Sequence, residues 1–163
     1  MAAALNFARI LEVLSRHRVE FILVGGVAAI LEGAPVSTLD LDIVAQPTPE
    51  DRERLLGALE ELHARYLDPA GRHLVPDAGK IETLRIHRLL TDFGPLDILE
   101  SIGDGMTFKD LVGETSLYEL EGMTVRVLNL ATIIRSKEAA NRDKDRATLP
   151  ILHRTMQLRE SDS

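Results

Sequence analysis

The sequence predicts an α/β (α+β) fold in which a mixed β-sheet is backed by helices and followed by C-terminal helices. Short apolar runs typical of buried strands alternate with stretches whose apolar residues recur at helical spacing. Gly and Pro residues separate these stretches. The length of 163 residues suits one domain. Within it we expect a core at residues 1–128 and a helical segment at residues 129–163 that packs on this core.

The first third of the chain is expected to contain two strands and three helices. Phe7, Ile10 and Leu14 lie on one side of a helix, and Thr48 followed by Pro49 is a typical helix start. The predicted elements are a helix at 5–18, a strand at 20–24, a helix at 27–31, a strand at 39–44 and a helix from 49 to about 65.

The middle of the chain is less regular. Pro and Gly residues between positions 66 and 80 predict a loop, which is either a mobile loop facing substrate or a variable surface connection. The polar tail at 157–163 is expected to fray. The predicted elements are a strand at 81–90, a turn at 91–95, a strand at 96–99, a glycine-rich turn at 101–105, one or two helical turns at 106–111, strands at 115–120 and 124–128, and a helix capped by Asn129.

A diglycine turn and an acidic pair stand out near the first two strands. Gly25 and Gly26 follow the apolar run that ends at Val24, and Asp40 and Asp42 lie at the second strand. Residues two apart in a strand point the same way, so the two carboxylates project side by side. A divalent cation with a preference for hard oxygen ligands, such as Mg²⁺, would neutralise them. The alternative is an ordinary strand–turn–helix with an acidic pair facing solvent.

The spacing of these motifs resembles the signature of the nucleotidyltransferase superfamily, which has the DNA polymerase β-like fold. The resemblance implies a nucleotidyltransferase fold in which Gly25 and Gly26 approach a triphosphate and Asp40 and Asp42 hold Mg²⁺ or Mn²⁺. Ser37 and Thr38 are assigned to phosphate or turn contacts. Many relatives carry Arg at the position of Ser37, which leaves no arginine contact there.

A third acidic residue of the family lies on a later strand, and Asp97 matches it in order and setting. It stands between Leu96 and Ile98, where an ionised carboxylate needs a partner. The resemblance implies that Asp97 completes the metal site and accepts a proton from the attacking hydroxyl. The alternative is a carboxylate on an edge strand that faces water.

A second motif lies in the C-terminal segment. Residues 136–145 resemble a Ser-Lys-x-x-Ala-x-Arg-x-Lys-Asp motif of small bacterial nucleotidyltransferase-like proteins, among them abortive-infection-type toxins of type IV toxin–antitoxin systems. The resemblance implies that Lys137, and with it the Lys144–Asp145 pair, faces the nucleotide. Lys137 and Lys144 share one side of a helix only if the helix is continuous. A family Asp is replaced here by Thr148, and an ordinary solvated helix is the alternative.

Composition limits the function classes. The formal net charge of −7 disfavours a general nucleic-acid binder, although residues 135–159 carry seven Lys or Arg against three Asp or Glu. The absence of cysteine excludes disulfides, thiolate catalysis and cysteine-based metal sites. We expect no membrane partner, because no apolar stretch approaches the ~20 residues that span a bilayer, and a cytoplasmic location, because no signal-peptide pattern is present.

Together these features predict a metal-dependent enzyme that transfers a nucleotidyl group from a nucleoside triphosphate. The acceptor could be a tRNA end, a protein side chain or a small hydroxylated molecule, and a cognate antitoxin is a candidate partner. The competing hypothesis is a nucleotide-binding or partner-binding module without turnover, for example one half of a toxin–antitoxin pair.

Overall fold

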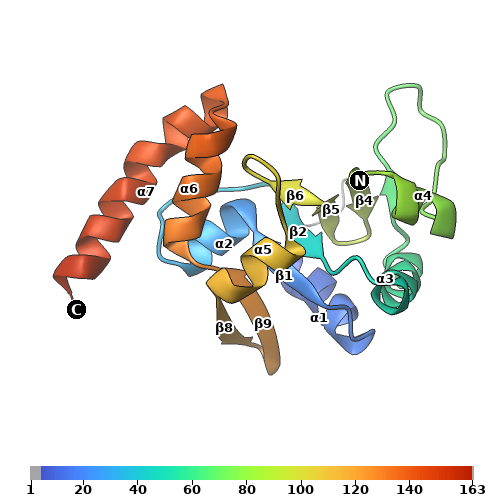
Figure 1. Ribbon diagram of the computed structural model, residues 1–163. Helices are drawn as coiled ribbons and strands as arrows, with labels where there is room; N and C mark the ends of the chain where they lie inside the picture. The colour runs from blue at the N-terminus through green and yellow to red at the C-terminus, as the bar shows by residue number, and fades with distance from the viewer. Residues whose placement is uncertain (1–4, 163) are drawn as a thin grey trace.

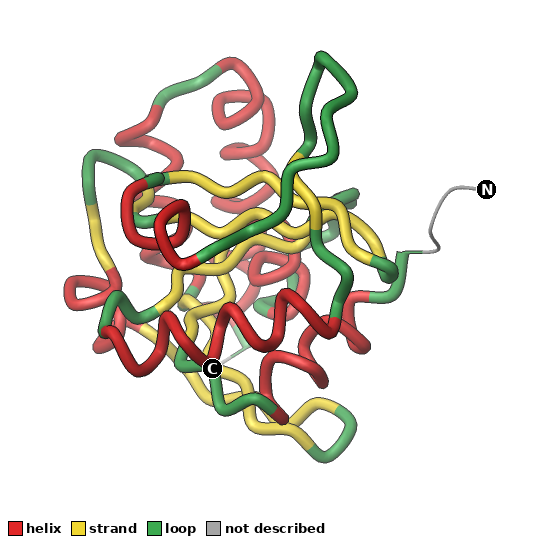
Figure 2. The backbone as a smooth tube through the Cα atoms, turned by 90° about the vertical axis from the view of Figure 1, so that its right-hand side faces the viewer, coloured by secondary structure: helices red, strands yellow, loops and turns green. Residues whose placement is uncertain are grey.

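One seven-stranded mixed sheet forms the centre of the molecule, with helices on either side of it (Figure 2). The computed structural model describes residues 5–162. The strand order is β3-β4-β5-β2-β1-β9-β8, with β2–β5 and β1–β9 parallel and the other neighbours antiparallel. The strands are β1 (Phe21–Val24), β2 (Leu41–Ala45), β3 (Arg65–Tyr66), β4 (Ile86–Thr91), β5 (Gly94–Leu99), β8 (Thr115–Leu120) and β9 (Met123–Leu128).

The helices gather mainly at the two ends of the sheet. In Figure 1, α6 and α7 lie together at one end and α3 and α4 at the other. A separate hairpin is formed by β6 (Ser101–Ile102) and β7 (Met106–Thr107). The helices are α1 (Phe7–Arg16), α2 (Gly25–Leu31), α3 (Pro49–Glu61), α4 (Ala78–Thr83), α5 (Phe108–Leu111), α6 (Leu130–Ala140) and α7 (Asp143–Ser161), with a 3₁₀ turn η1 (Val112–Glu114).

Helix starts follow the capping chemistry of the sequence. The Asn6 side chain accepts a hydrogen bond from the Arg9 amide at 3.3 Å, Thr48 accepts from Asp51 at 3.2 Å, and Asn129 accepts from Thr132 at 2.9 Å. Each bond satisfies an amide that the first helical turn leaves unpaired. The expected α/β class, with a mixed sheet backed by helices, is confirmed.

The central strands separate an apolar face from a polar one. Leu41 and Ile43 on β2, and Leu96 and Ile98 on β5, are buried in the main core. Strand alternation therefore turns the residues between them, which include Asp42 and Asp97, to the opposite face. The sheet thus presents the carboxylates of Asp42 and Asp97 on the face opposite Leu41, Ile43, Leu96 and Ile98, and buried Val24 and Val44 flank Asp42 on its own face.

The prediction for residues 81–90 is partly wrong. Helix α4 ends at Thr83, and β4 begins only at Ile86. Asp77 starts the helix, because its carboxylate accepts the Lys80 amide at 2.8 Å. The apparent strand alternation at Leu84 was misleading, since this residue ends the helix and is exposed.

The predictions for the turn at 101–105 and the helical turn at 106–111 are confirmed in part: the turn closes the β6–β7 hairpin, and the helical turn is α5, which begins only at Phe108. The prediction of a frayed tail is wrong, since α7 stays helical through Ser161. The end of α7 is anchored because Arg159 donates to the Glu32 carbonyl at 3.1 Å. Within residues 5–162, no helix is both long and apolar enough to cross a bilayer.

A core truncation tests the packing. Leu14 on α1 is fully buried, and we expect Leu14→Ala to reduce the free energy of unfolding by roughly 2–5 kcal/mol through lost burial and the cavity left behind. Urea denaturation measures this loss. The matched control is Leu117→Ala on β8, where 65% of the residue is exposed and a change within about 0.5 kcal/mol is expected. Equal losses in the two variants would contradict the placement of α1 on the core.

Candidate active site

A row of residues crosses four adjacent strands at the polar face of the sheet. Val24 on β1 pairs with Asp42 on β2, Asp42 pairs with Asp97 on β5, and Asp97 pairs with Arg88 on β4. Residues paired directly across strands point to the same face. Strand register therefore places Asp42, Asp97 and Arg88 side by side.

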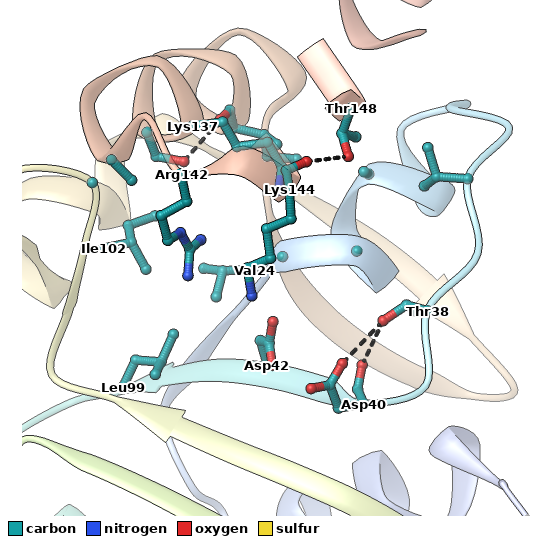
Figure 3. Close-up of a pocket in the computed structure, with 18 of the residues that line it drawn as sticks. Val24, Thr38, Asp40, Asp42, Leu99, Ile102, Lys137, Arg142, Lys144 and Thr148 are labelled. Carbon is teal, nitrogen blue, oxygen red and sulfur yellow. Dashed lines mark hydrogen bonds between the residues drawn. The ribbon is translucent and has the colours of Figure 1, made fainter. Parts of the chain in front are cut away.

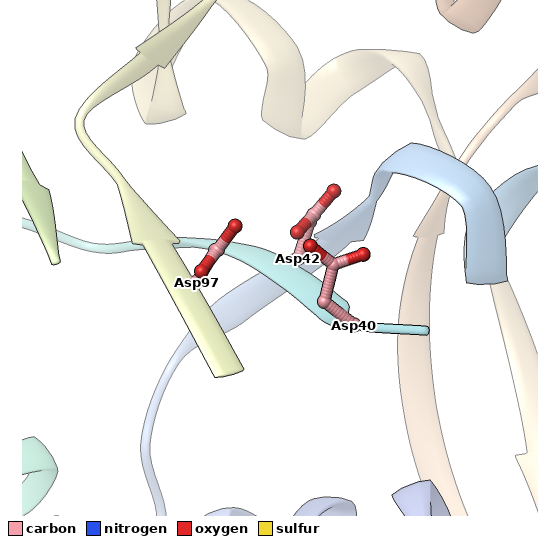
Figure 4. A group of neighbouring side chains, drawn as sticks. All are labelled: Asp40, Asp42 and Asp97. Carbon is pink, nitrogen blue, oxygen red and sulfur yellow. The ribbon is translucent and has the colours of Figure 1, made fainter. Parts of the chain in front are cut away.

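Asp40 joins the two strand carboxylates from the bend that precedes β2. One carboxylate oxygen each of Asp40, Asp42 and Asp97 lies within 4.8 Å of the other two. Figure 4 shows the three side chains converging from β5 and from the start of β2. The structure thus brings together the three acidic residues that the sequence singled out.

The electrostatics of this acidic triad are unfavourable in the metal-free protein. Burial, with the charges of Asp40 and Asp97, raises the pKa of Asp42 to about 7. Burial and the nearby Asp40 carboxylate also raise the pKa of Asp97. Lys144 and Lys137 oppose the shift at Asp42 but do not cancel it. The site is therefore organised to receive positive charge.

The donor set fits a hard divalent cation. The Oδ1 atom of Asp42 is buried without a hydrogen-bond partner among the described residues, which is costly for a carboxylate oxygen. Two oxygens on opposite sides of one Mg²⁺ lie about 4.2 Å apart, and the ligand oxygens of the triad lie within 4.8 Å of one another. Asp40, Asp42 and Asp97 could therefore hold a divalent cation together.

The diglycine turn lies directly beside the triad. Gly25 has a φ of +68°, and a Cβ there would come within 2.3 Å of Asp42 Oδ2. A Cβ on Gly26 would lie 2.7 Å from the Thr38 Cβ. Thr38 in turn donates to the Asp40 carbonyl and carboxylate at 3.1 and 3.2 Å. Thr38 thus positions Asp40, and glycine is required for the close approach of α2 to the carboxylates.

A cavity of about 910 Å³ opens above Asp40 and Asp42 (Figure 3), while Asp97 lies beside these two residues and is not part of the lining. Its lining includes Gly25, Gly26, Ser37, Thr38, Asp40 and Asp42, together with four cationic side chains from two directions. Lys137, Arg142 and Lys144 come from the α6–α7 side, opposite the strand that carries Asp40 and Asp42 (Figure 3), and Arg88 comes from β4.

Lys137 and Lys144 of the C-terminal motif both line the cavity, although they belong to two different helices. Asn141, at φ +50°, ends α6, and α7 begins two residues later. Lys137 and Lys144 are therefore not aligned on one helix, yet both line the cavity because the break folds α7 back against α6.

Asp145 holds this break together and does not line the cavity as the motif implied. Its carboxylate is fully buried, accepts two bonds from the Arg142 guanidinium at 2.7 and 3.2 Å, and lies 3.5 Å from Lys137 Nζ. Burial raises the pKa of Asp145, but the hydrogen bonds from Arg142 outweigh it and lower the pKa overall. Asp145 is therefore a positioning residue for two cavity cations.

Sequence reasoning missed Arg88 as a site residue. The available signal was strand register: in the predicted hairpin of residues 81–90 and 96–99, a residue facing Asp97 shares its side of the sheet. Once the turn is placed between Thr91 and Gly94, that residue is Arg88.

Comparison with known proteins identifies the architecture. No protein-family profile matches the chain, and no curated protein sequence matches it significantly. Among solved structures, a Thermotoga maritima protein described as a nucleotidyltransferase superposes with a TM-score of 0.56 at 20% identity, over 88% of each chain.

Two antibiotic-modifying enzymes also superpose. ANT(2″)-Ia in complex with adenylyl-2″-tobramycin matches with a TM-score of 0.55 at 16% identity, over 95% of this chain and 93% of that one. The lincosamide antibiotic adenylyltransferase LnuA, bound to lincomycin, matches with a TM-score of 0.53 at 17% identity, over 90% and 94% of the two chains. The chain therefore has the nucleotidyltransferase fold.

Proposed function

We propose that the protein is a metal-dependent nucleotidyltransferase that moves a nucleoside monophosphate from a nucleoside triphosphate to a hydroxyl acceptor. One observation supports this most strongly. Three carboxylates meet beneath two lysines, and one buried carboxylate oxygen has no hydrogen-bond partner among residues 5–162. A binding module without turnover would not need Asp97 as a base, so the presence of this carboxylate favours the enzyme over that alternative.

The chain supplies the parts of an in-line transfer. The acceptor oxygen forms a bond to the α-phosphorus, the bond from that phosphorus to the bridging oxygen breaks, and pyrophosphate leaves. Asp97 takes the proton of the acceptor hydroxyl. Lys137 and Lys144 neutralise the phosphates that leave, and Gly25 lets the triphosphate approach the backbone closely. When bound, Mg²⁺ or Mn²⁺ stabilises charge on the attacking and leaving oxygens.

The acceptor and the setting are part of the same proposal. The names of ANT(2″)-Ia and LnuA indicate small antibiotic acceptors, which supports a small hydroxylated molecule here, with a tRNA end or a protein side chain as the other candidates. The motif at residues 136–145 supports a cytoplasmic toxin role with a cognate antitoxin. Incubation with each labelled nucleoside triphosphate and cell extract, followed by separation of RNA, protein and small molecules, identifies the acceptor.

Removal of one metal ligand tests the assigned site. We expect Asp42→Asn to fold but to lose Mg²⁺-dependent triphosphate binding and to lower kcat/KM by more than about 100-fold, because even partners of metal ligands contribute 10–100-fold. Calorimetric titration with a non-transferable triphosphate analogue measures binding separately from turnover. Asp143→Asn is the control, since its side chain is 96% exposed. Unchanged binding and activity in Asp42→Asn would refute the site, and binding without any transfer by the wild type would favour the non-catalytic module.

The raised pKa of Asp42 makes metal-free stability dependent on pH. Asp42 binds its proton more tightly in the folded state than in the unfolded state. The folded protein therefore loses stability as the pH rises from 3.8, the unfolded pKa of this carboxyl, to about 7, its folded pKa, and the loss is complete above that pH. With EDTA present, we expect the wild-type free energy of unfolding to fall more steeply over this range than that of Asp42→Asn. Saturating Mg²⁺ should restore wild-type stability at pH 8. Parallel pH profiles of the two proteins would contradict the assigned repulsion.

The diglycine turn gives a second test with a matched control. Gly25 and Gly71 have nearly equal φ values of +68° and +72°, but a Cβ at Gly71 meets nothing within 4 Å. Gly71→Ala should cost about 1–2 kcal/mol of stability, from the left-handed conformation alone, and Gly25→Ala should cost at least as much because its Cβ also clashes with Asp42. Only Gly25→Ala should also weaken Mg²⁺ affinity, by about tenfold or more, since it displaces Asp42. Equal Mg²⁺ affinities in the two variants would argue against a role for this contact.

A further inference from the structure

We infer that Arg88 selects the acceptor, and that this acceptor carries a phosphate group close to the hydroxyl that attacks. The inference rests on the proposed function. It begins from the register of β4 and β5, which pairs Arg88 with Asp97 and so places both side chains on the same face of the sheet, where Arg88 lines the cavity.

The Arg88 side chain has no close charged or hydrogen-bonding partner in the described part of the chain. Its residue is exposed, and its guanidinium makes no hydrogen bond or ion pair within 4 Å across the described part of the chain. It acts on Asp97 only at longer range, where its charge lowers the pKa that burial and Asp40 raise. Arg142 and Lys137, in contrast, are already paired with Asp145.

The position of Arg88 assigns it to the acceptor. Lys144 and Lys137 approach the triad from the α6–α7 side, where the proposal places the departing phosphates (Figure 3). In-line transfer requires the attacking hydroxyl to enter from the other side of the α-phosphorus, beside the base Asp97. Arg88 is the strand neighbour of that base, so it meets the acceptor and not the pyrophosphate.

The charges around this position favour an anionic acceptor. Asp40 and Asp42 line the cavity, Asp97 lies beside them, and the proposed function assigns all three carboxylates to the cation or to the base. No other carboxylate among the lining residues would hold a cationic acceptor, whereas a planar guanidinium forms two parallel hydrogen bonds with a phosphate. The apolar side chains of Ile86 and Leu99 lie beside Arg88 in the same lining and would contact the uncharged part of the acceptor.

Binding experiments with defined probes test the inference. With Mg²⁺ and a saturating non-transferable triphosphate analogue present, calorimetric titrations would compare ribose 5-phosphate, a short RNA with a free 3′-hydroxyl, uncharged ribose and cationic tobramycin. We expect ribose 5-phosphate or the RNA to bind at least about tenfold more tightly than ribose and tobramycin. The stronger of the two phosphate-bearing probes distinguishes a sugar phosphate from a nucleic-acid end.

Variants assign the preference to Arg88. Arg88→Gln should weaken the phosphate-bearing probes about tenfold or more while it leaves affinity for the triphosphate analogue within about twofold, and Arg88→Lys should restore part of the loss. Arg85→Gln is the control, because this arginine precedes β4, has a side chain that is 88% exposed and does not line the cavity.

The outcomes separate the two proposals. Equal or weaker binding of both phosphate-bearing probes relative to ribose, or a matching loss of triphosphate affinity in Arg88→Gln, would overturn the role of Arg88. A triphosphate analogue that fails to bind the wild type with Mg²⁺ would instead overturn the proposed function.

Discussion

The repulsion between carboxylates on adjacent strands is the constraint on which the site depends. The parallel register of β2 and β5 places Asp42 directly beside Asp97, and the bend before β2 adds Asp40. Apolar residues at these positions would give a more stable sheet, since burial of like charges raises the free energy of the folded state. A bound cation would relieve the repulsion, and the energetic cost of the metal-free state would then contribute to the affinity for the metal.

On the α6–α7 side of the cavity, positively charged side chains lie close together and need compensation. Lys137 and Arg142 would repel each other at the break between α6 and α7, and buried Asp145 compensates both charges. Asn141, in a left-handed conformation, allows the chain to reverse there. The pairing also leaves Lys144 without an ion-pair partner in the described residues, with its charge acting on Asp42. The buried Asp145 carboxylate thus positions cationic side chains on the side of the cavity opposite the three partly buried carboxylates of the triad.

The success and the limits of sequence-based prediction have physical causes. Asp40 and Asp42 were identifiable because two like charges lie close together and their spacing from the diglycine resembles the nucleotidyltransferase signature. Asp97 was identifiable because an ionised carboxylate between Leu96 and Ile98 needs a partner. The helix at residues 78–83 was not predicted from the sequence. It has only six residues and depends on the Asp77 cap and on burial of Ile81, and neither feature produces a long periodic pattern.

Tertiary contacts explain the remaining differences. The position of Lys144 depends on the reversal at Asn141 and on the packing of α7 against α6, and the second of these cannot be predicted from local sequence. The end of α7 remains helical because Arg159 contacts Glu32, a residue more than a hundred positions earlier. Such long-range contacts have no local sequence signal.

The fold alone does not decide which acceptor this site receives. Under the proposed function, the triad, the diglycine turn and the lysines contact parts of a nucleotide that every nucleoside triphosphate shares, so they would carry no information about the second substrate. In that proposal, the information must come from other side chains close to Asp97. Arg88 meets this requirement because the register of β4 with β5 places it beside Asp97. If the proposed roles hold, a substitution on β4 would change acceptor specificity and leave the acidic triad and the lysines in place.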